Sequence, residues 1–444
     1  MVLKRVYTPY SSPAENMRVI ADLHIHGRYS RATSQRMCVE EIGRFARIKG
    51  LNIVGTGDFT HPKWLEELKI ALVPESDTGL YKIAKNPESP VYFMMTSEVS
   101  TLFTFGNETK KVHHVILTPS IETAVQINDV LAKYGNLAND GRPTLNLDAP
   151  HLVEEVMSVS SENMIFPAHA WTPWFSIFGA FSGFDSVEEC YQDMTKHVYA
   201  LETGLSSDPP MNWRLSKLDK FALVSNSDSH SFWPWRIGRE ANVFDLEKPS
   251  YREIVDAIRF KDKSRFKFTI ETDPSYGKYH WTGHRNCHVA LSSQDAAKLS
   301  NVCPVCRKKL TKGVEQRVEE LADRPDGYKP ENAIDFVRLL PLSEIIATVL
   351  SVDSPSGQQV WRIYNLLVER FDDEYTVLLN APKAALDEVV DNAISEAIIR
   401  VRDGLVKVMP GYDGVYGRLV IFDEQKTERS RHATVQQLNL TDFI

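Results

Sequence analysis

Asp22, His24 and His26 stand at the end of an apolar run, residues 19–21, near the start of the chain. Side chains alternate along a β-strand, so these three point the same way where the strand ends. Two imidazoles and a carboxylate at this spacing make half of a divalent-metal site. The alternative is a buried strand closed by three polar residues, and the motifs further along the chain argue against it.

The same kinds of polar residue follow or interrupt five further strand-like runs. Helix-like segments, such as 39–49 and 152–157, lie between most of these runs. Strands that alternate with helices predict a parallel sheet. Polar chemistry at successive strand ends is typical of a closed α/β barrel with its active site on the C-terminal face. The runs and their residues are 51–54 with Asp58 and His61, 91–95 with Glu98, 111–117 with His113 and His114, 164–166 with His169, and 221–224 with Asp228 and His230.

The order of these motifs (DLHIH, TGDFTH, an isolated Glu, a His, AHAW and SDSH) resembles the polymerase-and-histidinol-phosphatase (PHP) superfamily. The resemblance implies a distorted (β/α)7 barrel whose trinuclear metal cluster hydrolyses phosphoesters. It also implies a ligand set for each ion. These sets are His24, His26, Glu98 and Asp228 for the first metal, Glu98, His114 and His169 for the second, and Asp58 with His230 for the third.

Two positions depart from the superfamily pattern, and both concern the third metal. The residue after Asp58 is Phe59 where a His is usual, and His61 is the substitute that we expect. A further His often follows the first motif, where this chain has Ser30-Arg31-Ala32.

His113 and His114 are adjacent, and strand alternation lets only one of them face the site. We expect His114 to be the ligand.

A phosphodiester is anionic, so its hydrolysis needs water deprotonated near neutral pH and a stabilised leaving alkoxide. Clustered divalent ions meet both needs and neutralise the phosphate. Imidazole and carboxylate ligands suit Zn²⁺ or Mn²⁺, with Mg²⁺ a further option, and sequence does not choose between them. We expect up to three ions at the active site.

The composition predicts a globular protein of two or three domains. The chain has 444 residues, 43% of them apolar, which is enough for more than one core. No apolar run approaches the ~20 residues of a membrane span, and the first residues lack a signal-peptide pattern. Five cysteines, three of them close together, favour an intracellular protein with a metal module over a disulfide framework.

The net charge of −8 hides a strongly basic segment. Residues 259–312 contain twelve Lys/Arg and four Asp/Glu, a local net charge of +8, so the remainder carries −16. A local basic stripe is the electrostatic footprint of nucleic-acid binding. The alternative is a solvated basic face.

The basic segment also contains a predicted zinc site. His284-x2-Cys287 precedes Cys303-x2-Cys306 by fifteen residues, a spacing typical of zinc ribbons with four ligands around one structural Zn²⁺. The Cys-x2-Cys half is the stronger signal, because the first position of the other half is His. The adjacent Arg307, Lys308 and Lys309 could contact phosphates.

After a turn-rich linker at 323–330 the chain becomes helical, with apolar residues at helical spacing in 334–349, 358–371 and 384–402. We therefore expect four regions. These are a PHP barrel (1–258), a basic zinc-binding module (259–329), a helical DNA-binding domain (330–423) and a flexible tail (424–444).

Several aromatic residues are candidates for base contacts. Tyr412 and Tyr416 lie in a glycine-rich loop, and Trp171, Trp174 and Trp233 follow metal-motif residues. They could stack on a flipped base or wedge into a duplex. The alternative is that the tyrosine loop is an ordinary turn and that the tryptophans pack the loops against the helical region.

The complete order resembles the endonuclease Q family, DNA-repair enzymes of archaea and some bacteria, and implies an archaeal source. It runs from the PHP motifs through one Cys-Pro-Val-Cys zinc module to the Gly-Tyr-Asp-Gly-Val-Tyr-Gly loop. The resemblance implies cleavage 5′ to deaminated bases (uracil, hypoxanthine, xanthine) and to abasic sites. Two alternatives are a small-molecule, histidinol-phosphatase-like enzyme and a non-catalytic, clamp-associated DNA-binding protein.

The last eight residues contain Gln437, Leu440, Phe443 and Ile444 in the order Gln-x-x-aliphatic-x-x-Phe-apolar. This resembles the sliding-clamp (PCNA) interaction motif, in which a short tail orders on binding. The alternative is a terminal segment docked on its own domain. We expect a monomeric, cytoplasmic, nucleoid-associated protein that binds DNA and a clamp and no membrane.

Overall fold

Strand β1 (Met17–Asp22) is the run that precedes the two histidines, and it lies inside the main sheet. The computed structural model describes residues 16–422 of the chain. β1 is parallel to β2 (Ile53–Gly55) and antiparallel to β11 (Ala241–Leu246). Its last four residues are buried. A strand with neighbours on both edges and both faces covered is apolar throughout, which explains the continuous apolar run.

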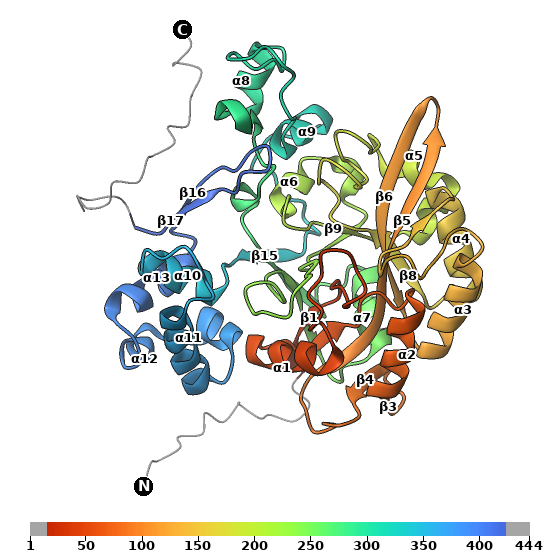
Figure 1. Ribbon diagram of the computed structural model, residues 1–444, viewed down its shortest axis with the longest axis horizontal. Helices are drawn as coiled ribbons and strands as arrows, with labels where there is room; N and C mark the ends of the chain where they lie inside the picture. Colours follow the sequence, from red (N-terminus) through yellow and green to blue (C-terminus); the bar gives the residue numbers. More distant parts are fainter. Residues whose placement is uncertain (1–15, 423–444) are drawn as a thin grey trace.

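The sheet is mixed rather than purely parallel, which corrects the prediction from sequence. β5 (Tyr92–Phe105) is parallel to β2, but β6 (Glu108–Thr118) turns back along β5. The cause is the two-residue connection 106–107, where Gly106 has a φ of +60°, because such a turn makes a hairpin. This long ribbon projects from the body of the molecule (Figure 1).

The other strands complete a mixed α/β fold. β8 is antiparallel to β6, and β9 and β10 form a parallel pair. Isolated bridges join Ile165 to Val198 and Ile25 to Ser229, so the ends of β1 and β10 lie together. The bounds are β3 (Leu72–Glu75), β4 (Leu80–Ile83), β7 (Thr144–Leu145), β8 (Met164–Pro167), β9 (Ala200–Glu202) and β10 (Ala222–Val224).

Helices cover this sheet as the alternation in the sequence predicts. Several begin at a residue whose side chain accepts a hydrogen bond from the first turn, as Ser120, Asp148 and Ser250 do. The helices are α1 (Val39–Lys49), α2 (Pro62–Ala71), α3 (Ile121–Leu131), α4 (Ala149–Val159), α5 (Val187–Tyr191), α6 (Pro209–Trp213) and α7 (Tyr251–Arg259).

The sheet does not end at the boundary expected at residue 258. β12 (Phe266–Glu271) is antiparallel to β11, and β15 (Asp335–Arg338) is parallel to β12. The basic segment between them forms a small separate region. It contains β13 (Thr282–His284), β14 (Val289–Leu291), α8 (Ser293–Lys298) and α9 (Val314–Leu321).

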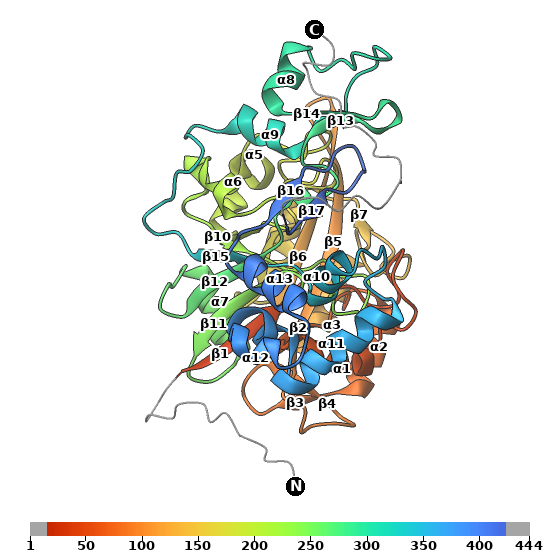
Figure 2. The same cartoon turned by 90° about the vertical axis from the view of Figure 1, so that its left-hand side faces the viewer.

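The region after β15 is helical up to residue 402 and ends in a hairpin. These helices lie beside α1, at the opposite end from α8 and α9, and the hairpin lies between the two groups (Figures 1 and 2). The elements are α10 (Leu342–Val349), α11 (Gln358–Phe371), α12 (Lys383–Asp387), α13 (Asn392–Arg402), β16 (Lys407–Met409) and β17 (Arg418–Val420).

A buried ion pair joins the helical region to α1. Lys49 Nζ lies 2.7 Å from Glu374 Oε1, and both side chains are almost completely buried. The same carboxylate accepts hydrogen bonds from the backbone N–H of Leu342 and the hydroxyl of Tyr364. A buried charge with this many partners is satisfied, whereas the loss of one partner would leave an uncompensated charge. Across residues 16–422, no helix is long and apolar enough to cross a membrane.

Candidate metal centre

His24 and His26 are oriented by carboxylates. Glu202, the last residue of β9, lies 3.0 Å from His24 Nδ1, and Asp58 Oδ1 lies 2.9 Å from His26 Nδ1. Both rings therefore present Nε2 to a common centre. A carboxylate that holds the outer nitrogen of an imidazole is the usual support for a metal-ligating histidine.

The first ligand set consists of His24, His26, Glu98 and Asp228, whose ligand atoms all lie within 4.8 Å of one another. His26 Nε2 is 2.9 Å from Asp228 Oδ1 and 3.2 Å from Glu98 Oε2. His24 Nε2 is buried and has no hydrogen-bond partner within residues 16–422. A buried nitrogen that faces two carboxylates without a hydrogen bond fits a divalent cation between them.

The second ligand set consists of Glu98, His113 and His169. Glu98 Oε1 lies 2.9 Å from His113 Nδ1 and 3.1 Å from His169 Nε2, whereas its Oε2 faces the first set. One carboxylate thus offers an oxygen to each set, so Glu98 can bridge two ions.

The expectation that His114 faces the site is wrong, and His113 takes that place. His114 Nε2 lies 2.9 Å from Thr101 Oγ1, and His114 Nδ1 lies 2.7 Å from Tyr191 Oη, on the other face of β6. The physical reason is the period of two along a strand, which places adjacent residues on opposite faces. The choice between His113 and His114 therefore depends on how β6 pairs with β5, which the sequence alone does not show.

Asp58, His61 and His230 are not brought together as a third ligand set within residues 16–422, which corrects that expectation. Asp58 supports His26 instead. The ring of His61 stacks on Tyr29, with centroids 4.5 Å apart and planes 10° apart. His230 Nδ1 lies 3.0 Å from the backbone oxygen of Asp228.

The backbone is strained at three residues of the centre. Asp58, His169 and Asp228 have φ of +50°, +32° and +48°, in the left-handed region that residues other than glycine rarely adopt. Such conformations persist where the surrounding structure imposes them, and they are concentrated at functional sites.

Buried charges shift the ionisation of the centre. Burial by itself raises the pKa of Glu98, but Arg142, His113 and His24 together hold it well below its usual range. Asp22 does not reach the centre. It accepts hydrogen bonds from the backbone N–H groups of Ser227 and Gly238, and burial raises its pKa to about 6.

Sequence reasoning missed two residues of the site, Glu202 and Arg142. Glu202 ends a strand as the other site residues do, so the same rule could have found it. Arg142 lies in the loop before β7, and its Nη1 is 3.0 Å from Glu98 Oε2. No local pattern in the sequence points to it.

A pocket of about 530 Å³ opens beside the two ligand sets, and His113, His169 and Asp228 are among its lining residues. Its rim includes Trp174 and Tyr416, whose side chains are 41% and 56% exposed. A pocket of this size with polar groups at one end and exposed aromatic rings at its rim can hold a planar organic group.

Two of the predicted aromatic contacts are wrong, because the rings of Trp171 and Tyr412 are buried, whereas Trp233 is partly buried. Trp171 is 1% exposed, and its Nε1 donates to Asn212 Oδ1 at 2.8 Å. Trp233 stacks on Trp235, with centroids 5.1 Å apart. Tyr412 is buried. Large rings next to packed elements leave water for the interior, and Trp233 packs on Trp361 of the helical region, as in the alternative given above.

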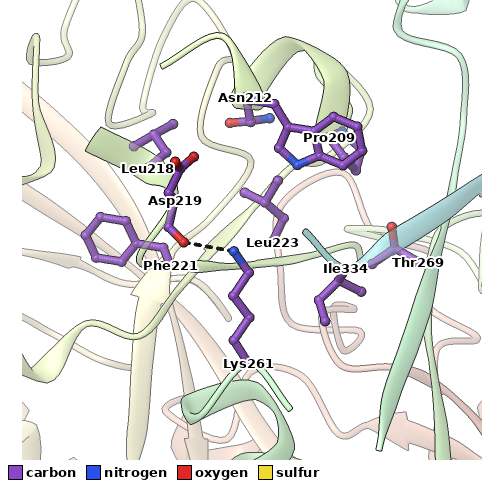
Figure 3. Close-up of a pocket in the computed structure, with 10 residues that line it drawn as sticks. Pro209, Asn212, Leu218, Asp219, Phe221, Leu223, Lys261, Thr269 and Ile334 are labelled. Atoms are coloured by element: carbon purple, nitrogen blue, oxygen red, sulfur yellow. Dashed lines mark hydrogen bonds between the residues drawn. The ribbon is translucent and has the colours of Figure 1, made fainter. Parts of the chain in front are cut away.

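A second cavity, between β10 and β12, is too small for a ligand. Its volume is about 10 Å³, room for about one water molecule. Lys261 Nζ donates to the backbone oxygen of Asp219 beside it, at 2.9 Å (Figure 3). No residue of the two ligand sets lines this cavity.

His284, Cys287, Cys303 and Cys306 converge in the basic segment, with ligand atoms within 4.8 Å of one another. Cys306 Sγ lies 3.3 Å from His284 Nδ1, and the three cysteines are free thiols. Three sulfurs and one imidazole nitrogen fit a closed tetrahedral Zn²⁺ site.

The basic residues next to this cluster are exposed, as Arg307, Lys308 and Lys309 show. The predicted clamp motif, residues 437–444, lies outside the described residues.

Comparison with known proteins finds one family model and several similar chains. A family model described as the MJ0043 C-terminal domain matches residues 341–405, which correspond to α10–α13. The structure superimposes on PfuEndoQ, the lesion-specific endonuclease of Pyrococcus furiosus, with a TM-score of 0.81 and 34% identity over 91% of this chain and 95% of that one.

Two further matches agree. Endonuclease Q in complex with a 27-mer duplex that carries an abasic lesion at the active site gives a TM-score of 0.80 and 34% identity, over 92% of this chain and 98% of that one. The uncharacterised protein MJ0043 of Methanocaldococcus jannaschii is 31% identical over 267 residues, or 59% of this chain. The match spans only 32% of the length of that protein.

Identity of 34% over nearly the whole length of both chains shows the family. The chain belongs to the endonuclease Q family of DNA endonucleases, and the resemblance found in its sequence is confirmed.

Proposed function

We propose that this protein is a DNA-repair endonuclease that hydrolyses the phosphodiester 5′ to deaminated bases and abasic sites at a multinuclear metal centre. The observation that carries the proposal is the position of the two ligand sets beside the 530 Å³ pocket. A phosphodiester at the ligands would have its flanking nucleotide within reach of the pocket. We also propose that the strands around the centre form a distorted (β/α)7 barrel of the PHP type.

The residues of the centre have distinct tasks in this proposal. His24, His26 and Asp228 would hold one ion, His113 and His169 would hold another, and Glu98 would offer one oxygen to each. When bound, divalent ions supply the Lewis acidity that acidifies water and neutralises phosphate charge. Glu202 and Asp58 keep the two imidazoles in the orientation and tautomer that ligation needs.

The pocket selects the lesion in this proposal. Extrusion of a base from the duplex costs a few kcal/mol, and least for a mismatched or damaged base, while an abasic site has no base to unstack. Trp174 and Tyr416 at the rim offer ring faces on which bases can stack. Lys278 Nζ lies 5.7 Å from the centroid of Tyr416, so a cation is available beside the rim for a flanking phosphate.

The zinc region and the helical region extend the DNA contact. The exposed Arg307, Lys308 and Lys309 lie next to the candidate zinc site, where they can contact phosphates while a structural Zn²⁺ holds the local fold.

We propose that residues 437–444 bind a sliding clamp. Titration of an archaeal clamp with the full chain and with a chain that ends at Gln436 tests this assignment. Equal binding by both chains, or by neither, would contradict it.

The central experiment is a cleavage assay. The full chain is incubated with Mg²⁺ or Mn²⁺ and labelled duplexes that carry uracil, hypoxanthine or an abasic site, beside an undamaged duplex and a small phosphomonoester. We expect nicks 5′ to each lesion, faster for uracil opposite guanine than for undamaged DNA. Hydrolysis of the phosphomonoester without any nick would point to the small-molecule phosphatase alternative.

A further inference from the structure

A short loop closes the place where a third metal ion would lie. Gly141 stands against the carboxylate of Asp58, and a Cβ at this position would lie 2.5 Å from Asp58 Oδ2 and still closer to Ser30 Oγ. The loop is fixed by hydrogen bonds from the Gly141 N–H to the Tyr29 oxygen (3.1 Å) and from Thr60 Oγ1 to the Gly141 oxygen (3.2 Å). The backbone of Gly141 therefore occupies the space beside Asp58 Oδ2 that an ion there would need.

Both oxygens of the Asp58 carboxylate are also engaged in hydrogen bonds. Its Oδ1 faces His26 Nδ1, and its Oδ2 accepts from the Gly27 N–H at 2.6 Å and from Ser30 Oγ at 2.9 Å. Phe59 follows it and is completely buried in the core. At the two positions where the sequence departs from the superfamily pattern, Ser30 thus donates a hydrogen bond and Phe59 packs in the core, where the superfamily has metal-ligating histidines.

The same loop delivers a permanent positive charge. Arg142 follows Gly141 directly, and its backbone N–H donates to Asp140 Oδ1 at 3.1 Å. Its Nη1 lies 3.0 Å from Glu98 Oε2. This contact is the one ion pair of Arg142 within residues 16–422. Its side chain is 25% exposed and lies beside the carboxylate that can bridge the two ions, and Nη1 is the nitrogen that pairs with Glu98.

We propose that the active centre of this protein holds two metal ions and that Arg142 replaces the third, contacting the scissile phosphodiester through the guanidinium nitrogens that Glu98 leaves free. The inference rests on the proposed function for its substrate. A guanidinium is always protonated, and its planar fork matches two phosphate oxygens.

Arg142 neither gives nor takes a proton in this scheme. Water oxygen bonds to phosphorus, the bond from phosphorus to one ester oxygen breaks, and that oxygen leaves as an alcohol with a proton from the water. Charge accumulates on the phosphate oxygens meanwhile, and Arg142 stabilises that charge, as an arginine does in other phosphoryl transfers.

The test compares Arg142→Ala and Arg142→Lys with Arg31→Ala in the metal-loaded full chain. Arg31 is a matched control, because it is exposed and its backbone N–H contacts the same Asp140. We expect three ions per chain by elemental analysis in the wild type and in all variants, two at the centre and one at the cysteines. Anomalous diffraction should locate no ion at Asp58.

Kinetic measurements distinguish a direct catalytic role of Arg142 from a role in positioning Glu98. We expect Arg142→Ala to lower kcat on an abasic duplex by roughly 100-fold while KM changes little, because the charge acts in the transition state. Arg142→Lys should recover part of the rate, since it restores the charge without the fork. Arg31→Ala should match the wild type.

Three outcomes would overturn the inference. These are a fourth ion per chain with density at Asp58, an unchanged kcat in Arg142→Ala, or the loss of active-site metal in that variant, which would make Arg142 merely a support for Glu98. A wild type that nicks no lesion duplex would instead refute the proposed function, and the ion count would still test the two-ion centre.

Discussion

The two candidate metal sites of this protein are built in opposite ways. The ligands of the active centre are Glu98, His113, His169, Asp228 and the two histidines after β1, and they are positioned by strands and loops that pack on a large apolar core. The Cys/His cluster takes its four ligands from 284–306, around a small apolar cluster of Val289, Leu291, Ala296, Cys303 and Leu310. We expect the large sheet core to fold without metal and the small cluster to need it.

This difference assigns different roles to the two sites. At the active centre, metal depends on a fold that exists already, so loss of a ligand should affect chemistry more than stability. At the Cys/His cluster, the fold depends on the metal, so loss of a ligand should affect structure first. The predictions below test this division, from the largest expected effect to the smallest.

Asp228→Ala or His169→Ala should reduce strand cleavage by at least about 1,000-fold, because each removes a ligand of the centre. Binding of a lesion duplex should be largely retained, since it depends on the pocket and the basic residues. Gel-shift assays and single-turnover cleavage on the same preparation measure both properties. Wild-type cleavage rates in either variant would refute the assignment of the centre.

His113→Ala and His114→Ala should differ although the residues are adjacent. The first should lower activity by at least about 1,000-fold with little effect on the melting temperature, because His113 belongs to the same ligand set as His169. The second should lower the melting temperature, because it leaves the buried Tyr191 hydroxyl without its partner at about 1–3 kcal/mol. The reverse pattern would restore His114 as the ligand.

Much of the site could be predicted from the sequence, because strand alternation and strand ends are local properties. The first ligand set and the Cys/His cluster were found in this way. The errors came from non-local facts. The choice between His113 and His114 depends on how β6 pairs with β5. The burial of Trp171 depends on which surfaces meet, and the position of Arg142 depends on a loop that is hydrogen-bonded to Tyr29 and Thr60.

Cys303→Ser combined with Cys306→Ser should remove one zinc ion per chain and unfold the region around β13, β14 and α8. The small apolar cluster cannot offset the conformational entropy without the metal. Elemental analysis measures the zinc content, and hydrogen exchange should show faster exchange that is confined to residues 282–310. Cys38→Ser is the control, and it should keep the zinc. An unchanged zinc content in the double variant would contradict a structural site.

The smallest expected effect belongs to a buried carboxylate that no metal site uses. Glu271 ends β12 and accepts hydrogen bonds from Thr203 Oγ1 (2.9 Å) and Thr269 Oγ1 (2.5 Å). Burial raises its pKa from 4.5 to about 8. The folded state therefore binds more protons than the unfolded state between these values, so this contribution to stability is present at low pH and declines as the pH rises towards 8.

Glu271→Gln copies the protonated form and should flatten this dependence. We expect the melting temperature of the wild type to fall by a few degrees more than that of the variant between pH 6 and pH 9, from a contribution on the order of a few kcal/mol. Glu369→Gln, at an exposed residue of α11, should behave as the wild type. Because Glu271 lies in the sheet core, the difference should persist after chelation of all metal. A difference that vanished with the metal would mean that the sheet core also depends on bound ions, and would contradict the contrast between the two sites.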